Sequence, residues 1–316
     1  MCICFVLINN IPSKFPFRIC LASNRDEYFT RPSAPLQRWP SPNHHIIGGR
    51  DLTPGKENGT WAAVNSLNGK IAFLLNVRNR QPLLPDTAPE RRGRGGLVPD
   101  FLRSPHSVAD FARDLSLRGQ EYDPFLLLML EPNGTSGAYE GHYLINVDSQ
   151  HKVFKSDNEA KAFVFSNSHP DKPFLKASSG LKLFETILSN YEGMPRLSDN
   201  SREKLQSSLF ELLSTETQFF PDPALIESFP ENFPQMFLER VSSINVVAHE
   251  KEYGTRAQTV MLLDFEGSMQ VVEKDTLPDQ YRRPRLSGTA NELGQQEGLE
   301  RTIRMSFPLL SAPVAS

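Results

Sequence analysis

The sequence predicts an α+β protein made of two antiparallel sheets covered by helices. Strand-like segments occur toward both ends of the chain, and residues with helical spacing fall between them without a regular strand–helix alternation. The helical pattern is clearest in two stripes: Phe184, Ile187, Leu188 and Tyr191, followed by Leu205, Leu209, Leu212 and Leu213. Such stripes are expected to pack on a sheet. No internal repeat or domain boundary interrupts the pattern.

The first element is an N-terminal hairpin. The segment from Cys2 to Asn9 and the segment from Phe17 to Ala22 are apolar and rich in β-branched residues, and turn-forming residues separate them. In an antiparallel pair, the end of the returning strand lies beside the start of the first strand. The polar residues that follow Ala22 are therefore predicted to emerge next to Cys2.

This proximity suggests nucleophilic chemistry. Cys2 follows Met1, and removal of Met1 would give Cys2 a free α-amine, with a pKa of about 8, beside a thiol with a pKa of about 8.5. Asp26 would hold the amine, and Asn24 or a backbone N–H would face a developing oxyanion. The plain alternative is that Met-Cys is a common start and that the polar cluster merely ends a strand.

The remaining elements follow from alternation and turn signals. Asn68-Gly69 is read as a hairpin turn, and Ser104-Pro105 as the start of a helix that ends near Leu117. Tyr253 to Arg256 is read as another hairpin turn. Further strands are predicted at 60–65, 70–77, 125–131, 142–147, 162–166, 241–247, 257–264 and 269–273.

Several motifs resemble those of a known family. Asn24-Arg25-Asp26-Glu27 is similar to the signature of the NRDE family, also called the transport and Golgi organization family, type two. The resemblance covers roughly residues 1 to 275. It is carried further by the segments GTWAAVN (59–65), AFLLNVR (72–78), RGGLV (94–98), FSNS (165–168) and YGTRAQT (253–259).

That family in turn resembles the N-terminal nucleophile hydrolases, which implies a four-layer αββα sandwich and a thiol hydrolase of linear amides. On this resemblance Cys2 is the nucleophile, Asp26 contacts its amine, and Asn76 and Asn167 stabilise the oxyanion. One departure is that Ser23 stands where those hydrolases usually have an arginine. Arg25 is the nearest substitute, but alternation along a strand predicts that its side chain points to the opposite face.

Arginines are the candidate substrate contacts. Arg256 could pair with a substrate carboxylate, and Arg25 and Arg78 are grouped with it. The run from Arg91 to Arg94 lies in a proline-rich loop, where a solvated face is the ordinary reading. The sharper hypothesis is that this run meets a phosphate, a coenzyme A tail or haem propionates.

Composition excludes several classes. The chain has 316 residues, 39% hydrophobic content and a formal charge of −3, which does not indicate a nucleic-acid-binding protein. Three cysteines near the start do not form a disulfide framework, and no segment has the length of a transmembrane helix. We expect a cytoplasmic protein, with association with the Golgi or mitochondria left open. A metal site at Cys2, Cys4, His44 and His45 matches no standard zinc spacing, so neither metal nor cofactor is predicted.

The expected domain spans residues 1–275, and residues 276–316 are expected to be a mobile tail because their composition shifts to Pro, Gly, Arg, Gln and Ser. Three functions remain open. The protein hydrolyses an amide through Cys2, or it binds haem or an acylated lipid such as acyl-coenzyme A without turnover, or it acts through protein partners on Golgi organisation and secretion. The oligomeric state is left open.

Overall fold

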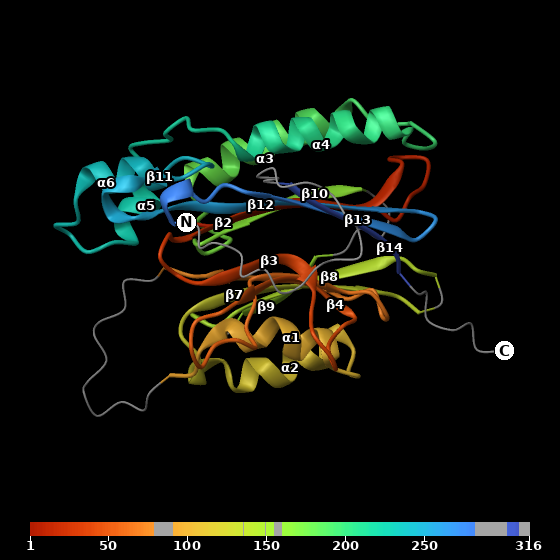
Figure 1. The fold of residues 1–316 in the computed structure, drawn as a ribbon, viewed down its shortest axis with the longest axis horizontal. Helices are drawn as coiled ribbons and strands as arrows, with labels where there is room; N and C mark the ends of the chain where they lie inside the picture. Colours follow the sequence, from red (N-terminus) through yellow and green to blue (C-terminus); the bar gives the residue numbers. More distant parts are fainter. Residues whose placement is uncertain (79–90, 135, 149, 155–159, 282–301, 310–316) are drawn as a thin grey trace.

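The computed structural model describes residues 1–78, 91–134, 136–148, 150–154, 160–281 and 302–309. These residues form four layers, in which two sheets face each other and helices cover the outer face of each sheet (Figure 1). Among the described residues, neighbouring strands of both sheets run antiparallel. The predicted αββα sandwich is therefore confirmed.

The first sheet carries the chain terminus. Its strand order is β10-β1-β2-β12-β13-β14, and the short β11 pairs with β12. The bounds are β1 Ile3–Ile8, β2 Phe17–Tyr28, β10 Lys161–Ser166, β11 Val247–Ala248, β12 Tyr253–Asp264, β13 Ser268–Asp275 and β14 Thr302–Pro308. Because β1 lies between β10 and β2, the start of the chain is held on both sides.

The second sheet follows the chain order from β3 to β9 as a meander. Its strands are β3 Ser33–Arg38, β4 Ile46–Asp51, β5 Ala62–Asn65, β6 Ile71–Asn76, β7 Phe125–Pro132, β8 Tyr139–Ile145 and β9 Gln150–Phe154. Each strand pairs with the next strand in the sequence, and the long connection from β6 to β7 contains α1 and α2. The predicted turn at Asn68-Gly69 joins β5 to β6, and Gly69 has a φ of 71°.

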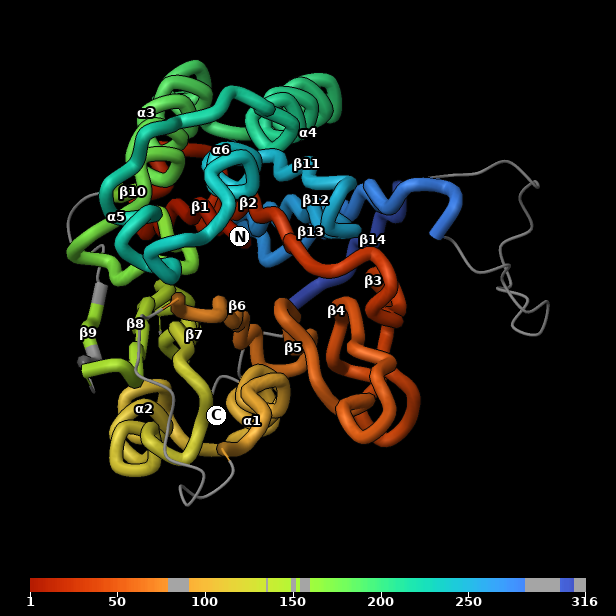
Figure 2. Tube along the Cα trace, turned by 90° about the vertical axis from the view of Figure 1, so that its left-hand side faces the viewer, coloured from red at the N-terminus to blue at the C-terminus, as the bar shows by residue number. Residues whose placement is uncertain are grey.

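Helices cover the outer faces. α3 and α4 lie over the first sheet and α1 and α2 over the second, while α5 and α6 lie beside the N-terminus (Figures 1 and 2). The α-helices are α1 Leu97–Arg103, α2 Val108–Leu117, α3 Leu175–Ser189, α4 Asp199–Leu213, α5 Pro223–Glu227 and α6 Gln235–Val241. Short 3₁₀ helices are η1 Arg94–Gly96, η2 Gly119–Glu121, η3 His249–Lys251 and η4 Asp279–Tyr281.

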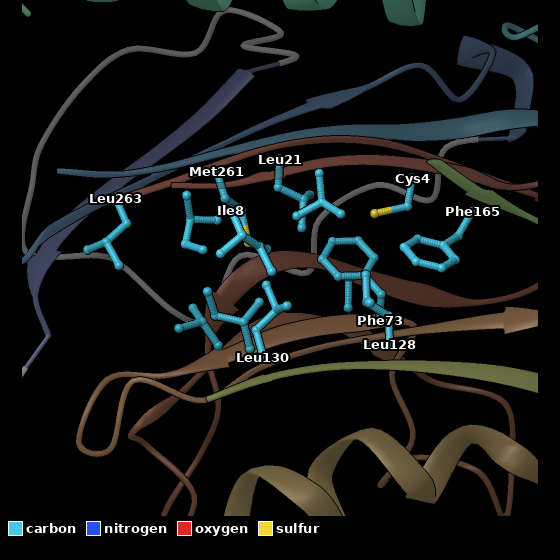
Figure 3. Close-up of a cluster of buried hydrophobic side chains, with 14 of the residues drawn as sticks. Cys4, Ile8, Leu21, Phe73, Leu128, Leu130, Phe165, Met261 and Leu263 are labelled. Atoms are coloured by element: carbon cyan, nitrogen blue, oxygen red, sulfur yellow. The ribbon is translucent and has the colours of Figure 1, made fainter. Parts of the chain in front are cut away.

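Alternation along β1 builds two cores at once. Cys4, Val6 and Ile8 point between the sheets, where they meet side chains of both layers (Figure 3). Ile3, Phe5 and Leu7 point the other way, under α3 and α4. A strand buried on both faces is a continuous apolar run, and this is why β1 is recognisable from sequence. The two helical stripes of α3 and α4 pack on this outer core, as predicted.

Several elements are not predicted from the sequence, among them β3, β4 and α1. β3 contains Pro35 and β4 contains Gly48-Gly49, so the segment from Arg31 to Lys56 reads as a loop. A proline is tolerated because β3 is the edge strand of its sheet. The helix α1 was missed because it is short and follows a glycine-rich turn. β9 was missed as well.

Three element boundaries differ from the prediction. The helix expected from Ser104 begins at Val108, because Ser107 caps it by accepting a hydrogen bond from the Asp110 N–H. The strand expected at 241–247 is the end of α6 followed by a buried loop, of which only Val247 pairs with β12. Its apolar residues are buried by packing on α-helical neighbours and not by strand pairing.

The turn expected at Tyr253 to Arg256 is the start of β12. The positive φ falls on Glu252, at 49°, and not on Gly254. Gly254 is needed for close approach, because a Cβ there would lie 2.6 Å from the Val246 carbonyl oxygen. Within the segment expected to be a mobile tail, η4 and β14 are ordered elements, and β14 pairs with β13.

A buried carboxyl links the two sheets. Glu273 on β13 is 3% exposed, and its Oε1 accepts a hydrogen bond of 2.8 Å from the Leu36 N–H on β3. Burial raises the pKa of Glu273 to about 7. Because the folded state favours the protonated acid, ionisation of Glu273 costs stability progressively as the pH rises from about 4.5 to about 7.

Glu273→Gln is therefore expected to stabilise the protein above pH 7. The gain should be on the order of 2 to 3 kcal/mol at pH 8 and should shrink toward pH 5, where wild-type Glu273 stays protonated in the folded state. Urea unfolding at pH 5, 6, 7 and 8 measures it, with Glu185→Gln on the exposed face of α3 as control. A difference that does not change with pH would contradict this account.

Candidate functional site

The pairing of β1 with β2 brings the predicted residues together. Ile3 lies opposite Asn24, so the same register continued by one residue places Cys2 beside Arg25. The Asp26 N–H donates a hydrogen bond to Cys2 Sγ at 3.3 Å. The predicted proximity of Cys2 to the polar cluster is thus present, and an N–H donor of this kind favours the thiolate.

A cavity of about 440 Å³ opens at Cys2. Its walls come from the ends of β2 and β6 and from two glycine-rich loops of the second sheet. The lining residues are Cys2, Arg25, Asp26, Glu27, Arg31, Asp51, Gly55, Lys56, Asn58, Gly59, Thr60, Trp61, Leu74, Asn76, Gly93, Arg94, Gly95, Gly96 and Asp123. The volume lies in the range of small-molecule sites, and the lining is largely charged and polar.

The chain terminus is buried next to this cavity, beside α6 and β11 (Figures 1 and 2). The Met1 ammonium lies 2.8 Å from Asp26 Oδ2 and donates a hydrogen bond of 2.6 Å to the Tyr253 hydroxyl. Thr255 Oγ1 donates to Asp26 Oδ1 at 2.7 Å. Burial lowers the pKa of the Met1 amine. Asp26 therefore does hold an α-amine, which here belongs to Met1.

Lys176 was not anticipated by the sequence analysis. It lies in the first turn of α3 and is fully buried, and its Nζ donates to the Met1 carbonyl oxygen at 2.7 Å and to the Ser243 carbonyl oxygen at 2.9 Å. Burial lowers its pKa to about 8. No sequence pattern distinguishes this lysine, because its partners are backbone carbonyls of distant segments. Tyr253 and Thr255 were also missed, because their partners, the Met1 amine and Asp26 Oδ1, lie far away in the sequence.

Arg25 faces the cavity, which corrects the strand-alternation argument. Positions 23 and 25 are two residues apart and so share a face of β2, the face that carries Cys2 Sγ. The Arg25 guanidinium stacks on Trp61, with its carbon 4.0 Å from the ring centroid. Trp61 packs against the core between the sheets and also lines the cavity. Gly49 makes room for it, since a Cβ there would lie 2.3 Å from the indole.

Two carboxylates of the cavity wall, Glu27 and Asp51, are paired with Arg31. Its guanidinium lies 3.0 Å from Glu27 Oε2 and 2.6 Å from Asp51 Oδ2. These ion pairs join the end of β2 to β4 across the connection into β3. Arg94, from the predicted arginine run, also lines the cavity and donates to the Pro124 carbonyl oxygen at 2.8 Å.

The two asparagines expected at the oxyanion have different positions. Asn76 lines the cavity at the end of β6. Asn167 does not line it; its Nδ2 donates to the Asn76 backbone oxygen, and its own carbonyl accepts the Arg78 N–H. Its Oδ1 is buried without a hydrogen-bond partner among the described residues. Asn167 is thus placed to position Asn76.

Three candidates lie away from the cavity. Asn24 points under the helices, where its Nδ2 donates to the carbonyl oxygens of Leu213 and Ile244, because alternation turns it from Cys2. The guanidinium of Arg256 donates to the carbonyl oxygens of Tyr28 and Arg31 and so fixes the β2–β3 connection. Arg78 donates to Met1 Sδ and stacks on Phe229, so it contacts the terminus and not the described cavity wall.

The three thiols differ in access. Cys4 and Cys20 are fully buried in the cores on opposite faces of the first sheet, whereas Cys2 is half-buried at the cavity. Burial raises the pKa of all three, and for Cys2 the terminal amine and Arg25 oppose that rise. Within the described part of the chain, no cluster of three metal-ligating side chains occurs.

In the native protein, iodoacetamide is expected to alkylate Cys2 and to leave Cys4 and Cys20 unmodified, because only Cys2 reaches a cavity. Mass spectrometry of the peptides after brief labelling measures this, and the rate should rise with pH above 8. A Cys2→Ser variant should take up no label until it is unfolded, when both remaining thiols react. Labelling of native Cys4 at a comparable rate would contradict the assignment.

Comparison with known proteins finds one family. The family described as "Transport and Golgi organisation 2" matches residues 1–278. The chain is 31% identical over 279 residues to Transport and Golgi organization protein 2 of Drosophila melanogaster, covering 87% of this chain and 92% of that protein. It is 30% identical to the Homo sapiens and Mus musculus homologues, each over 88% of this chain and 94% of the relative.

Among solved structures, penicillin V acylase from Agrobacterium tumefaciens is similar, with 12% identity and a TM-score of 0.34 over 87% of this chain and 83% of that one. This similarity is too low to support an argument about chemistry. In the described ranges, no helix is both long and apolar enough to cross a membrane.

Proposed function

The chain belongs to the Transport and Golgi organisation 2 family, which is named for Golgi organisation and transport, and we propose that within this role it is a thiol amidohydrolase. The proposed reaction is hydrolysis of a linear amide bound in the cavity at Cys2. The observation that carries the proposal is the position of Cys2. It is the thiol among the described cavity-lining residues, and it lies beside an α-amine site held by Asp26.

The mechanism begins with loss of Met1, so that Cys2 carries the terminal amine. Asp26 and Tyr253, which hold the amine in the structure, then face the new terminus. The α-amine takes the thiol proton, Cys2 Sγ attacks the amide carbonyl carbon, and the carbonyl oxygen becomes an oxyanion. The carbon–nitrogen bond breaks as the amine returns that proton to the leaving group. Water then hydrolyses the thioester and restores the thiol.

Oxyanion stabilisation is assigned to Asn76. Its side chain lines the same cavity as Cys2, and a single well-placed donor contributes about 10²- to 10³-fold to such reactions. Asn167, which directly follows β10, donates a hydrogen bond from its side chain to the Asn76 backbone oxygen and so holds Asn76 in place. Because the charge develops only during attack, this arrangement acts on the transition state more than on substrate binding.

A second candidate is a binding protein without turnover, for haem or an acylated lipid such as acyl-coenzyme A. It is favoured by the cationic part of the wall, where Arg25, Arg94 and Lys56 could meet propionates or phosphates. Saturable binding of haem or acyl-coenzyme A that persists in Cys2→Ala, with no amide hydrolysis by the wild type, would favour this candidate. Either chemistry is compatible with action on the Golgi through protein partners.

The mature protein is expected to begin at Cys2. Intact mass spectrometry of protein purified from its native host measures this as a loss of one methionine residue. Retention of Met1 would leave Cys2 without a free α-amine and would end the proposed mechanism, although the cavity and its thiol would remain.

Asn167→Ala is expected to lower kcat by about 10²-fold with a much smaller change in KM, because it displaces Asn76 from the developing oxyanion. Release of amine from a panel of linear N-acyl amides measures turnover. Asn190→Ala, at the exposed end of α3, is the matched control and should behave as wild type. A kcat for Asn167→Ala equal to wild type would remove this assignment.

A further inference from the structure

The Arg25 guanidinium is a buried cation without a hydrogen-bond partner. The residue is 6% exposed and lines the cavity, and no described residue accepts a hydrogen bond from its guanidinium. The nearest carboxylate oxygen, Glu27 Oε2, is 4.0 Å from Nη2. Burying a charge without a partner is costly, and burial lowers the pKa of Arg25. Such a group is a mark of a functional site.

The neighbouring carboxylates are already committed elsewhere. Glu27 and Asp51 share Arg31 at 3.0 Å and 2.6 Å, and Asp26 pairs with the terminal amine at 2.8 Å. Arg25 is thus a buried cation on the described wall whose hydrogen-bonding edge remains open. An anion that entered the cavity would complete the pairing.

Trp61 fixes the orientation of that edge. The guanidinium carbon lies 4.0 Å over the ring centroid, so the indole covers one side of the group and its N–H donors must find acceptors elsewhere. A planar anion can accept two parallel hydrogen bonds from a guanidinium. A carboxylate has this geometry.

We infer that Arg25 binds a carboxylate of the substrate, so that the amides hydrolysed are those with a carboxylate close to the scissile bond, as in an N-acyl amino acid. The statement that an amide is hydrolysed rests on the proposed function. The statement that a carboxylate is bound rests on Arg25 and Trp61 alone. Arg25 is then the specificity-determining residue of the cavity.

The position of Arg25 sets how close the carboxylate must be. Residues directly opposite on antiparallel strands have Cβ atoms about 5 Å apart, and the register places Arg25 opposite Cys2. The carboxylate and the attacked carbonyl therefore lie within a few bonds of each other. An α-amino acid on the leaving side of the amide meets this requirement.

Binding is tested first in Cys2→Ala, which removes turnover from the measurement. N-acetylglycine and its neutral isostere N-acetylglycinamide are titrated at millimolar concentration while the Arg25 Nε–H signal is followed by NMR. N-acetylglycine should bind about 10- to 100-fold more tightly and shift that signal. The preference for N-acetylglycine should disappear in Arg25→Met. It should be weakened in Arg25→Lys, which keeps the positive charge but lacks the two parallel N–H donors of the guanidinium. Arg113→Met on the exposed face of α2 is the control.

Thermal melting separates recognition from a structural role. Because the charge has no hydrogen-bond partner in the free protein, Arg25→Met should melt close to wild type. Equal binding of the two probes, no binding of N-acetylglycine, or a preference that survives Arg25→Met would each overturn the inference. Tighter binding of the phosphonate analogue, acetamidomethylphosphonate, would overturn it in favour of a phosphate ligand.

Turnover distinguishes this inference from the proposed function. Carboxylate binding at Arg25 with no amide hydrolysis by the wild type would reject the hydrolase and leave the carboxylate site standing. Hydrolysis of acid and carboxamide substrates with equal kcat/KM would support the hydrolase and reject the carboxylate site.

Discussion

A buried ion pair between Asp26 and the chain terminus organises this protein. Both groups are removed from solvent, so the pair is stable only if their remaining donors and acceptors have hydrogen-bond partners. Thr255 supplies one to the carboxylate, Tyr253 accepts one from the amine, and Lys176 binds the Met1 carbonyl oxygen. These partners come from β12 and α3, so the terminus is fixed by elements far along the chain. The fixed terminus in turn sets the position of the Cys2 sulfur.

The cavity joins two kinds of structure. On one side, the ends of β2 and β6 present Cys2, Arg25 and Asn76 from strands whose neighbours are buried in the core between the sheets. On the other side, loops rich in glycine approach closely; Thr60 N–H, for example, donates to the Gly95 carbonyl oxygen. Strands give precise placement of reacting groups, whereas loops determine what fits beside them. The strands thus carry both the proposed nucleophile and Arg25, and the loops shape the space beside them.

The balance of charge in the cavity is local and not a property of the whole chain. A net charge of −3 gives no indication of an anion site. Yet Arg31 is shared between two carboxylates and Asp26 is taken by the amine, which leaves Arg25 open toward the cavity. The family to which the chain belongs is named for Golgi organisation and transport, and the proposed chemistry of the cavity is a separate matter. A small-molecule reaction and a role in secretion are compatible in one protein.

Much of the fold follows from sequence because alternation and helical spacing are local signals. They identify β1, β2, α3 and α4 and the proximity of Cys2 to Asp26, since hairpin register is set over short distances. They fail at β3, where Pro35 is tolerated only on an edge strand, and at β14, whose partner lies across a long connection.

For the site, the sequence by itself determined which residue is the nucleophile candidate and which carboxylate lies beside it. The tertiary structure decided that the Asn24 side chain points away from Cys2. It also decided that Arg256 and Asn167 hold backbone oxygens in place beside the cavity. Lys176 and Tyr253 were found around the chain terminus only in the folded protein. The physical reason is that side-chain direction and partner depend on packing between strands and helices distant in sequence, which no local pattern encodes.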